Sequence, residues 1–259
     1  MASVRAKKHL GQHFLHDKNA AQRIVAALDP AMGFEKVLEV GPGMGVLSDF
    51  LFENEAYESF LVDIDDESIE YLQAKYPDEK DRIFYGDFLN FDFDKQGLDP
   101  CAVIGNFPYN ISSQIVFKIL EERNKVIQMV GMFQKEVAER CIASPGGKDY
   151  GILSVFVQAY YDVKYLFTVK AGAFNPPPKV LSGVIEFRRN KVEKLDCDEN
   201  LFRTVVKAAF NQRRKTLRNA LAKVIAKDKM TDHPFYEKRA ERLSVADFVE
   251  LTQLIEETR

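Results

Sequence analysis

The feature that most constrains the fold is an alternation, over the first ~190 residues, of short apolar runs with longer segments of helical spacing. Such alternation is typical of a mostly parallel sheet covered by helices on both faces. Helices are predicted at Ser112–Glu122 and Gln134–Ala143. The runs that predict β structure are Val37–Val40, Phe60–Ile64, Ile83–Tyr85, Ala102–Ile104, Val126–Phe133, Leu153–Tyr161 with Tyr165–Val169, and Gly183–Arg188. We therefore expect an α/β fold in this part of the chain.

The rest of the chain has the pattern of helices alone. Apolar residues recur on one helical face, a further helix is predicted at Thr216–Ile225, and Ser244 followed by Asp247 resembles a capping box that opens a last helix ending near Glu257. The apolar face comprises Phe202, Val205, Val206, Ala209 and Phe210. The change of pattern predicts two domains, residues 1–194 and a small helical domain at residues 195–259.

Composition excludes several classes of protein. No apolar run reaches the ~18 residues of a membrane span, and the basic N-terminus lacks the apolar stretch of a signal peptide. The cysteines, Cys101, Cys141 and Cys197, lie far apart and match no metal-ligand spacing, so we expect neither zinc nor a disulfide framework. These features favour a reducing, cytoplasmic setting.

A glycine-rich turn follows the first strand of the predicted sheet. Glu39 stands just before it, and Gly41, Gly43 and Gly45 would let the backbone turn sharply and approach a ligand without a Cβ in the way. Open α/β sheets bind ligands at this edge, where the strands end. The G-x-G-x-G spacing by itself is weak evidence, because dinucleotide-binding folds show a similar run.

Carboxylates at the ends of the next strands sharpen this interpretation. Asp63, about 20 residues further on, can accept both ribose hydroxyls of a nucleoside. Asp87 can accept a hydrogen bond from an adenine amino group, and Phe88 can flank the ring. Since acids would repel a diphosphate, the set favours S-adenosylmethionine over NAD. Asp65 and Asp66 are interpreted as solvated turn residues.

The fourth strand ends in Asn106-Phe-Pro-Tyr109, which matches the N/D-P-P-Y/F pattern of amino-group methyltransferases. An exocyclic adenine nitrogen is a poor nucleophile, because its lone pair is delocalised into the ring. The side-chain oxygen of Asn106 and the carbonyl oxygen of Pro108 can hold its N–H groups and aim the lone pair at a methyl carbon. Tyr109 can stack on the flipped base. Phe174, in the proline-stiffened loop that ends at Lys179, would by itself be interpreted as a buried anchor.

The chain resembles the KsgA-type ribosomal RNA adenine dimethyltransferases over nearly its whole length. The motifs that carry the resemblance are Gly11-Gln-His-Phe-Leu15, Glu39-Val-Gly-Pro-Gly43, Gly105-Asn-Phe-Pro-Tyr-Asn-Ile-Ser112, Phe174-Asn-Pro-Pro-Pro-Lys-Val180 and Phe210-Asn-Gln-Arg-Arg-Lys-Thr-Leu-Arg218. The resemblance implies a Rossmann-like domain with a mostly parallel seven-stranded sheet and a helical RNA-binding domain. It also implies dimethylation of two adjacent adenines near the 3′ end of small-subunit rRNA, during small-subunit biogenesis, by a monomer without a metal.

The resemblance also assigns residues to roles. It makes the basic arm formed by residues 1–20 complete the cofactor site, and it has Phe174 and Tyr109 sandwich the target base. The expected S-adenosylmethionine contacts are His13, Leu15, Glu39, Gly41, Gly43, Asp63, Ile64, Asp87, Phe88 and Asn106. His13 departs from the family pattern, which usually has Asn there.

The formal net charge of -3 conceals two unlike parts. Between Glu39 and Asp99 there are 17 acidic and 4 basic residues, so the rest of the chain is net positive. RNA contacts are predicted there, at Arg5, Lys7 and Lys8 in an arm that is mobile until RNA binds, and in an acid-free stretch of the helical domain. The residues of that stretch are Arg203, Lys207, Arg213, Arg214, Lys215 and Arg218.

Other functions stay open at this point. A ribosome-assembly factor that mainly binds an immature small subunit is compatible with the same motifs. The large-subunit dimethyltransferases of macrolide resistance resemble the first domain, although Gly105 and the Asn211–Lys215 block favour the small-subunit enzymes. DNA adenine methyltransferases usually carry D-P-P-Y, and the basic helical domain argues against a small-molecule substrate.

Overall fold

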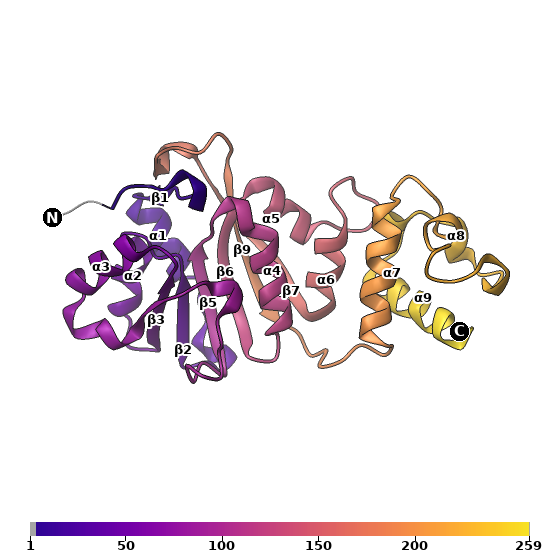
Figure 1. Cartoon of the computed structure of the whole chain (residues 1–259), viewed down its shortest axis with the longest axis horizontal. Coiled ribbons are helices and arrows are strands. Elements are labelled where there is room, and N and C mark those ends of the chain that lie inside the picture. The colour runs from indigo at the N-terminus through magenta and orange to yellow at the C-terminus, as the bar shows by residue number, and fades with distance from the viewer. Residues whose placement is uncertain (1–3, 259) are drawn as a thin grey trace. The chain divides into compact units, whose positions relative to one another are not determined.

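The computed structural model describes residues 4–258, so the first three residues of the predicted arm lie outside it. A seven-stranded sheet with the order β4-β3-β2-β5-β6-β9-β7 forms the centre of the fold (Figure 1). Strands β2 to β6 pair in parallel with their neighbours, and β9 runs antiparallel to β6. The bounds are β2 Lys36–Val40, β3 Glu58–Asp63, β4 Ile83–Tyr85, β5 Cys101–Asn106, β6 Val126–Gln134, β7 Tyr161–Val169 and β9 Ser182–Arg189. The predicted α/β fold with a mostly parallel seven-stranded sheet is confirmed.

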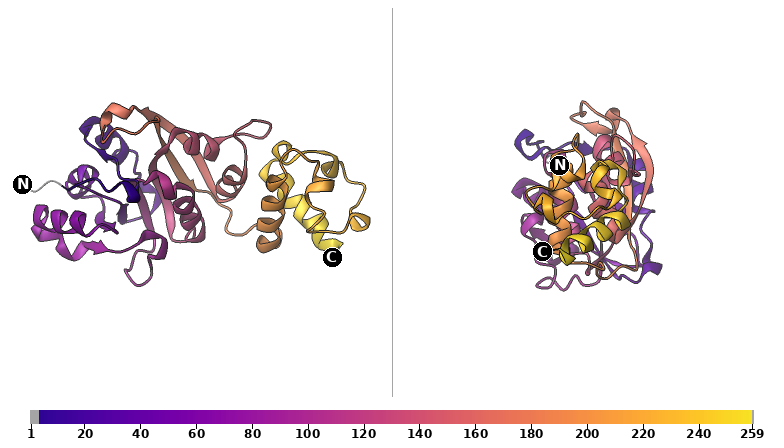
Figure 2. Two further views of the ribbon diagram at one scale, coloured as in Figure 1. Left: turned by 45° about the horizontal axis from the view of Figure 1, so that its top comes forward. Right: turned by 90° about the vertical axis from the view of Figure 1, so that its right-hand side faces the viewer.

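Helices connect the strands, and a separate two-stranded sheet pairs β1 (Phe14–Leu15) with β8 (Phe174–Asn175). Helix α4, which contacts β6, lies in front of the strands in Figure 1, and Figure 2 shows the same elements from two further sides. The helices are α1 Lys18–Val25, α2 Val46–Phe52, α3 Asp66–Lys75, α4 Ser112–Glu121, α5 Lys135–Ile142, α6 Ile152–Tyr160, α7 Glu199–Asn211, α8 Leu217–Ala220 and α9 Val245–Glu257.

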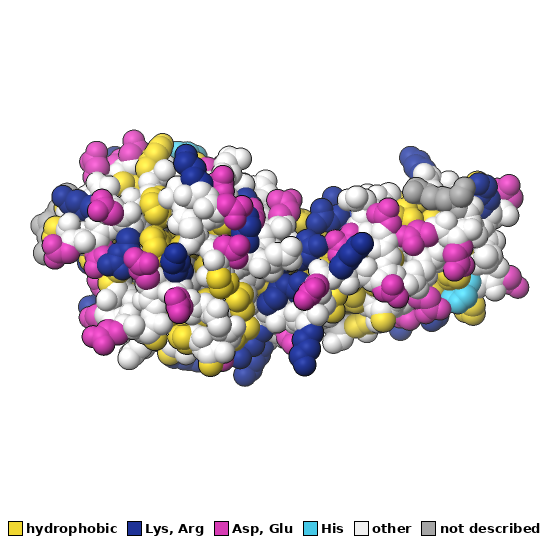
Figure 3. Space-filling model, turned by 90° about the horizontal axis from the view of Figure 1, so that it is seen from below, with side chains coloured by type: hydrophobic (Ala, Val, Ile, Leu, Met, Phe, Trp, Pro, Cys, Tyr) yellow, Lys and Arg dark blue, Asp and Glu magenta, His cyan; other side chains and the backbone are white. Residues whose placement is uncertain are grey.

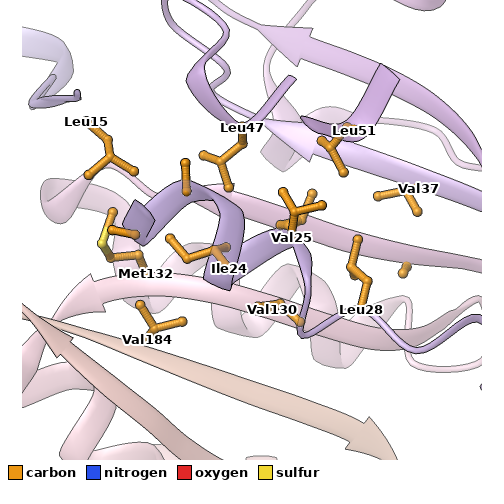
Figure 4. Packing of buried hydrophobic residues seen from close by; sticks show 14 of the residues in the cluster. Leu15, Ile24, Val25, Leu28, Val37, Leu47, Leu51, Val130, Met132 and Val184 are labelled. Atoms are coloured by element: carbon orange, nitrogen blue, oxygen red, sulfur yellow. The ribbon is translucent and has the colours of Figure 1, made fainter. Parts of the chain in front are cut away.

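The core of the sheet domain lies between α1, α2 and one face of the sheet (Figure 4). Ile24 and Leu51, from the two helices, are fully buried against strand residues such as Val37 and Val130. Because side chains on a strand alternate between faces, this face also carries Glu39, whose neighbours in the register are Leu61 and Ile104. The apolar packing therefore fixes the strand ends that carry the predicted carboxylates.

Contacts divide the chain into two compact units. The first comprises the residues up to Ala138 together with Val163–Arg189, and the second comprises Glu139–Asp162 and the chain from Asn190 onward. This division places a central segment with the C-terminal helices, whereas the sequence predicts one boundary at residue 195. Aromatic packing explains the difference, because Phe156 of α6 contacts Phe202 of α7 at a ring-centroid distance of 6.0 Å.

Two local predictions about the second unit are wrong. Leu153–Tyr161, predicted as β structure, forms helix α6, which starts at Ile152 with Gly151 as N-cap and the side chain of Ser154 closing its first turn. The run is buried nearly all round, and burial on every side removes the periodicity that separates a helix from a strand. The helix predicted at Thr216–Ile225 is only the short α8.

The last helix begins at the residue that the sequence predicts. Ser244 caps α9 and forms the predicted capping box with Asp247. The hydroxyl oxygen of Ser244 accepts the backbone N–H of Asp247 at 3.1 Å. Cys101, Cys141 and Cys197 are free thiols, the first two of them buried. No helix in the described part of the chain is long and apolar enough to cross a bilayer.

Candidate active site

The glycine turn after β2 has the backbone geometry that demands glycine. Gly41 and Gly43 have φ values of 68° and 55°, in the left-handed region. A Cβ on Gly43 would lie 2.7 Å from the ring of Phe14, so the turn also packs tightly against the N-terminal arm. At Gly41 a Cβ would have only a Pro108 side-chain carbon nearby, at 4.0 Å, which leaves that side of the turn open to a ligand.

Asp63 ends β3 beside this turn. One carboxylate oxygen accepts the backbone N–H of Gly43 at 3.3 Å, and the other accepts that of Asp65 at 3.0 Å. Burial raises the pKa of Asp63 to about 6, although these hydrogen bonds oppose the shift. The backbone thus holds the Asp63 carboxylate at the position predicted for ribose recognition, although burial makes its charged form less favourable.

Two further carboxylates were predicted to contact the cofactor. Asp87 accepts the backbone N–H of Leu89 at 2.9 Å and the side-chain amide of Asn90 at 2.8 Å, and so caps the short helical turn Phe88–Asn90. Glu39 is fully buried, accepts a hydrogen bond from Ser48 at 2.5 Å, and has its pKa raised to about 8 by burial. Glu39 therefore supports the turn from beneath.

The end of β5 presents the predicted catalytic residues. The side-chain amide nitrogen of Asn106 donates to the backbone carbonyl of His13 at 2.8 Å, which directs its amide oxygen the other way. The carbonyl of Pro108 accepts two long hydrogen bonds, from the hydroxyl of Ser112 at 3.2 Å and from the backbone N–H of Ile111 at 3.4 Å. The hydroxyl of Tyr109 lies 2.6 Å from that of Ser182, so this contact holds the hydroxyl end of the ring in place.

These groups line one cleft. The cleft has a volume of about 210 Å³ and is open on one side. The lining residues are Leu10, Gly11, Gln12, His13, Phe14, Gly41, Gly43, Asp63, Ile64, Asp87, Leu89, Asn106, Phe107, Pro108, Tyr109, Asn110 and Ile111. Two of these described residues are carboxylic acids and none is Lys or Arg, which suits a cation or a neutral nucleoside and not a diphosphate.

Four predicted site residues lie outside this lining. Glu39 is beneath the turn, as above, and Leu15 is 3% exposed and packs in the core. Phe88 is buried against Phe93, with ring centroids 6.2 Å apart, and its neighbour Leu89 lines the cleft instead. Phe174 lies outside the lining because side chains alternate along a strand: β8 turns Phe174 into the core and exposes Asn175. Phe174 therefore does not line the cleft with Tyr109 in this structure, and the sandwich of a base between the two rings stays a prediction.

The aromatic neighbour of Tyr109 in the cleft is His13. Their ring centroids lie 5.4 Å apart with planes tilted by 32°. The Nδ1 atom of His13 donates to the carbonyl of Pro176 at 2.8 Å, which ties the arm to the proline-rich loop. An Asn side chain, which the family usually has at position 13, also carries an N–H that could donate to the carbonyl of Pro176. Leu10, Gly11, Gln12 and Phe14 also line the cleft but are not among the predicted contacts. Their position depends on partners far away in the sequence, such as the strand β8 that pairs with Phe14, and no local pattern reveals it.

The predicted RNA contacts of the arm fall into two kinds. Arg5 and Lys8 are exposed. Lys7 instead pairs with the protein's own acids, at 2.5 Å from Asp65 and 3.3 Å from Glu67. The ammonium group of Lys7, which is predicted to contact RNA, is thus already held by a nearly buried carboxylate, and the RNA contact stays a prediction.

In the second unit, the predicted RNA contacts lie along α7 and in the segment that follows it. Arg203, Lys207, Arg214 and Lys215 are exposed. Arg213 donates to the carbonyl of Gly147 at 3.1 Å, and Arg218 pairs with Glu237 at 2.8 Å. On the face seen in Figure 3, Lys and Arg side chains are interspersed with acidic ones.

A backbone bridge adds cations that the sequence did not bring together. Thr216 pairs with Arg239 as an isolated β-bridge, and the N–H of Leu217 donates to the carbonyl of Lys238 at 2.8 Å. Lys238 and Arg239 are exposed and thus lie beside Arg214 and Lys215. We call these four residues the basic rim.

Comparisons with known proteins show which family this chain resembles. The family model described as ribosomal RNA adenine dimethylase matches residues 3–257. A Cytophaga hutchinsonii protein named ribosomal RNA small subunit methyltransferase A is 54% identical over 255 residues, which are 98% of this chain and 99% of the relative. A Flavobacterium johnsoniae protein of the same name is 51% identical over 257 residues, 99% of this chain and 98% of the relative.

Solved structures resemble the fold as well. A dimethyladenosine transferase from Plasmodium falciparum is 26% identical with a TM-score of 0.77, covering 95% of this chain and 98% of that one. The 23S rRNA methyltransferase ErmE, 24% identical with a TM-score of 0.66, covers 93% of this chain and 99% of that one.

Proposed function

Because the chain belongs to the ribosomal RNA adenine dimethylase family, we propose that it dimethylates the N6 amino groups of two adjacent adenines near the 3′ end of small-subunit rRNA. The family makes it a methyltransferase that uses S-adenosylmethionine. The observation that carries the proposal is that Asn106, Pro108 and Tyr109 line the same cleft as Gly41 and Asp63. The names of the curated relatives support the small subunit as the substrate.

The cleft fits S-adenosylmethionine by its chemistry. The carboxylate of Asp63 would accept the ribose hydroxyls, and Ile64, which is 47% exposed beside it, offers an apolar surface for the adenine. Asp87 would accept from the adenine amino group, and the open side of Gly41 leaves room for the chain that carries the sulfonium. When bound, the cofactor supplies an electrophilic methyl carbon and leaves as a neutral thioether.

The chain's own residues prepare the target nitrogen. Since Asn106 is anchored through its amide nitrogen, its oxygen can accept one N6–H, and the Pro108 carbonyl, whose contacts with Ile111 and Ser112 are long, would accept the other. Held this way, the nitrogen would direct its lone pair at the methyl carbon, and after transfer it would give up a proton to water. Tyr109, locked by Ser182, would stack on the flipped base.

The basic rim is the part of the second unit best suited to RNA. Its four cations are exposed and come from two chain segments joined by backbone hydrogen bonds, so they form a fixed surface for phosphates. Arg213 and Arg218, which are held by the protein's own groups, would contribute less. Action on an immature particle and by a monomer stay predictions.

Methyl transfer from labelled S-adenosylmethionine tests the proposal. Immature small subunits, naked rRNA and free adenosine are compared as substrates, and we expect transfer to the small-subunit substrates only. Asn106→Ala should lower transfer by at least about 100-fold, since it removes a transition-state acceptor. Asn54→Ala, at an exposed asparagine of the same unit, is the matched control. Activity on free adenosine, or on no RNA at all, would contradict the proposal.

A further inference from the structure

A cluster of hydrogen bonds and ion pairs ties the N-terminal arm to the start of α3. The ammonium group of Lys7 lies 2.5 Å from one carboxylate oxygen of Asp65, and the side-chain amide of Gln12 donates to the other oxygen at 2.8 Å. The amide oxygen of Gln12 accepts the backbone N–H of Lys7 at 2.7 Å. Lys7, Gln12 and Asp65 thus form a closed set of three contacts, which we call the arm latch.

The anchor of the latch is rigid. Asp65 is 1% exposed and is the N-cap of α3, where it accepts the backbone N–H of Glu67 and the hydroxyl of Ser68, both at 3.2 Å. Its own backbone N–H donates to the carboxylate of Asp63 at 3.0 Å. The residue that holds the arm is therefore fixed to the residue predicted to hold the ribose.

The segment that the latch holds forms one wall of the cofactor cleft. Residues 10–14 all line the cleft. From His13 onward the arm has other anchors, because Asn106 donates to the carbonyl of His13 and Phe14 is paired with Asn175. Before that point, Asn110 makes only a long contact of 3.5 Å with the carbonyl of His9. The latch is accordingly the strongest described tie of the arm upstream of His13.

We propose that Asp65 is a positioning residue that closes the arm over the cofactor cleft, through Lys7 and Gln12. The inference deepens the proposed function and rests on it, because the ligand of the cleft is taken to be S-adenosylmethionine. The latch sets the fraction of molecules whose cleft has its arm wall in place. Apparent cofactor affinity falls in proportion when that fraction falls, whereas transfer from the bound state is left nearly unchanged.

Asp65→Asn is the test, because Asn is also a good N-cap but removes the charge nearest to Lys7 and one of the two oxygens that accept from the arm and from Ser68, while Glu67 stays 3.3 Å from Lys7. The matched control is Asp66→Asn on the adjacent residue, whose side chain is 81% exposed and lies 3.9 Å from Lys7. Calorimetry with S-adenosylhomocysteine measures affinity, and hydrogen exchange of residues 5–13 measures arm docking in the absence of ligand.

We expect Asp65→Asn to weaken binding about tenfold if the arm is then docked about a tenth of the time. Arm exchange should accelerate, the KM for S-adenosylmethionine should rise, and kcat should stay within about twofold. Lys7→Gln should do the same, and the double variant should be no worse than either single one. Asp66→Asn should behave as the wild type.

The two proposals fail in different ways. If the wild-type protein does not bind S-adenosylhomocysteine, the proposed function is wrong. If it binds, but Asp65→Asn changes neither affinity nor arm exchange, the latch is overturned. Equal losses in Asp65→Asn and Asp66→Asn would also overturn it, because a general charge effect would then account for both.

Discussion

Asp63→Asn should stabilise the cofactor-free protein while weakening its hold on the cofactor. The Asp63 side chain is nearly buried, and a pKa raised from 3.8 to about 6 corresponds to about 3 kcal/mol of unfavourable free energy for the charged form. Because the folded state binds the proton more tightly than the unfolded state, the free energy of unfolding falls as pH rises from about 4 to about 6. The full cost is then present at neutral pH.

The side-chain amide of the Asp63→Asn variant should lose part of this gain in the free energy of unfolding. Asp63 accepts two backbone N–H groups, from Asp65 at 3.0 Å and from Gly43 at 3.3 Å, whereas Asn has one oxygen. The weaker contact to Gly43 should be lost, at about 1 kcal/mol. The net expectation is a gain of about 2 kcal/mol in the free energy of unfolding at pH 7.

Urea denaturation without cofactor measures this gain at pH 7 and again at pH 4.5, where protonation of the wild-type carboxyl should erase most of it. Affinity for S-adenosylhomocysteine should fall roughly 10- to 100-fold, since hydrogen bonds to a charged acceptor are lost. Asp66→Asn, at an exposed carboxylate, should change neither quantity. A variant less stable than the wild type at pH 7, or a gain independent of pH, would refute the reasoning.

Three further predictions concern other parts of the site. Tyr109→Phe and Ser182→Ala should each lower kcat for methyl transfer about fivefold, because each removes the same hydrogen bond of about 1 kcal/mol. The double variant should therefore lower kcat no further than either single variant. Additive losses would argue against an orienting role for this hydrogen bond. Phe174→Leu should cost about 1 kcal/mol in urea denaturation and leave kcat within about twofold; a large loss of kcat at unchanged stability would support the stacking role. Gly43→Ala should weaken cofactor binding in calorimetry, because the added Cβ would lie 2.7 Å from an aromatic ring of the arm. Gly33→Ala is the control, since Gly33 also has a left-handed backbone but an added Cβ there would have no atom within 4 Å. This variant should leave cofactor binding unchanged.

Local patterns predicted the frame of the site well. The strand that ends at Val40, the glycine turn and the carboxylate of Asp63 follow from features within a few residues of one another. The Ser244 capping box is also a local signal, and it is confirmed. Parallel strands bring their ends to one edge, so residues far apart in sequence could be assigned to a common site without knowledge of their contacts.

The differences between prediction and structure concern properties that distant partners decide. Phe88 and Phe174 carry the expected residue type, but their direction depends on packing and strand pairing that no local pattern encodes. Asp65 was interpreted as solvated because it stands in a charged turn, yet Lys7 and Gln12, more than fifty positions away, make it a buried acceptor. The basic rim likewise depends on a bridge between segments that are separate in the sequence.

The pairing of β1 with β8 has a consequence for the order of synthesis. It joins Phe14 to Asn175, so the end of the arm that lines the cleft cannot pair until a segment made much later has left the ribosome. At typical elongation rates that interval is roughly 10 to 30 s. During it, the strands that follow the glycine turn can already assemble and the arm latch can close, while Phe14 and Leu15 wait unpaired. A nascent chain halted before residue 175 should therefore contain much of the sheet and still be unable to retain the cofactor.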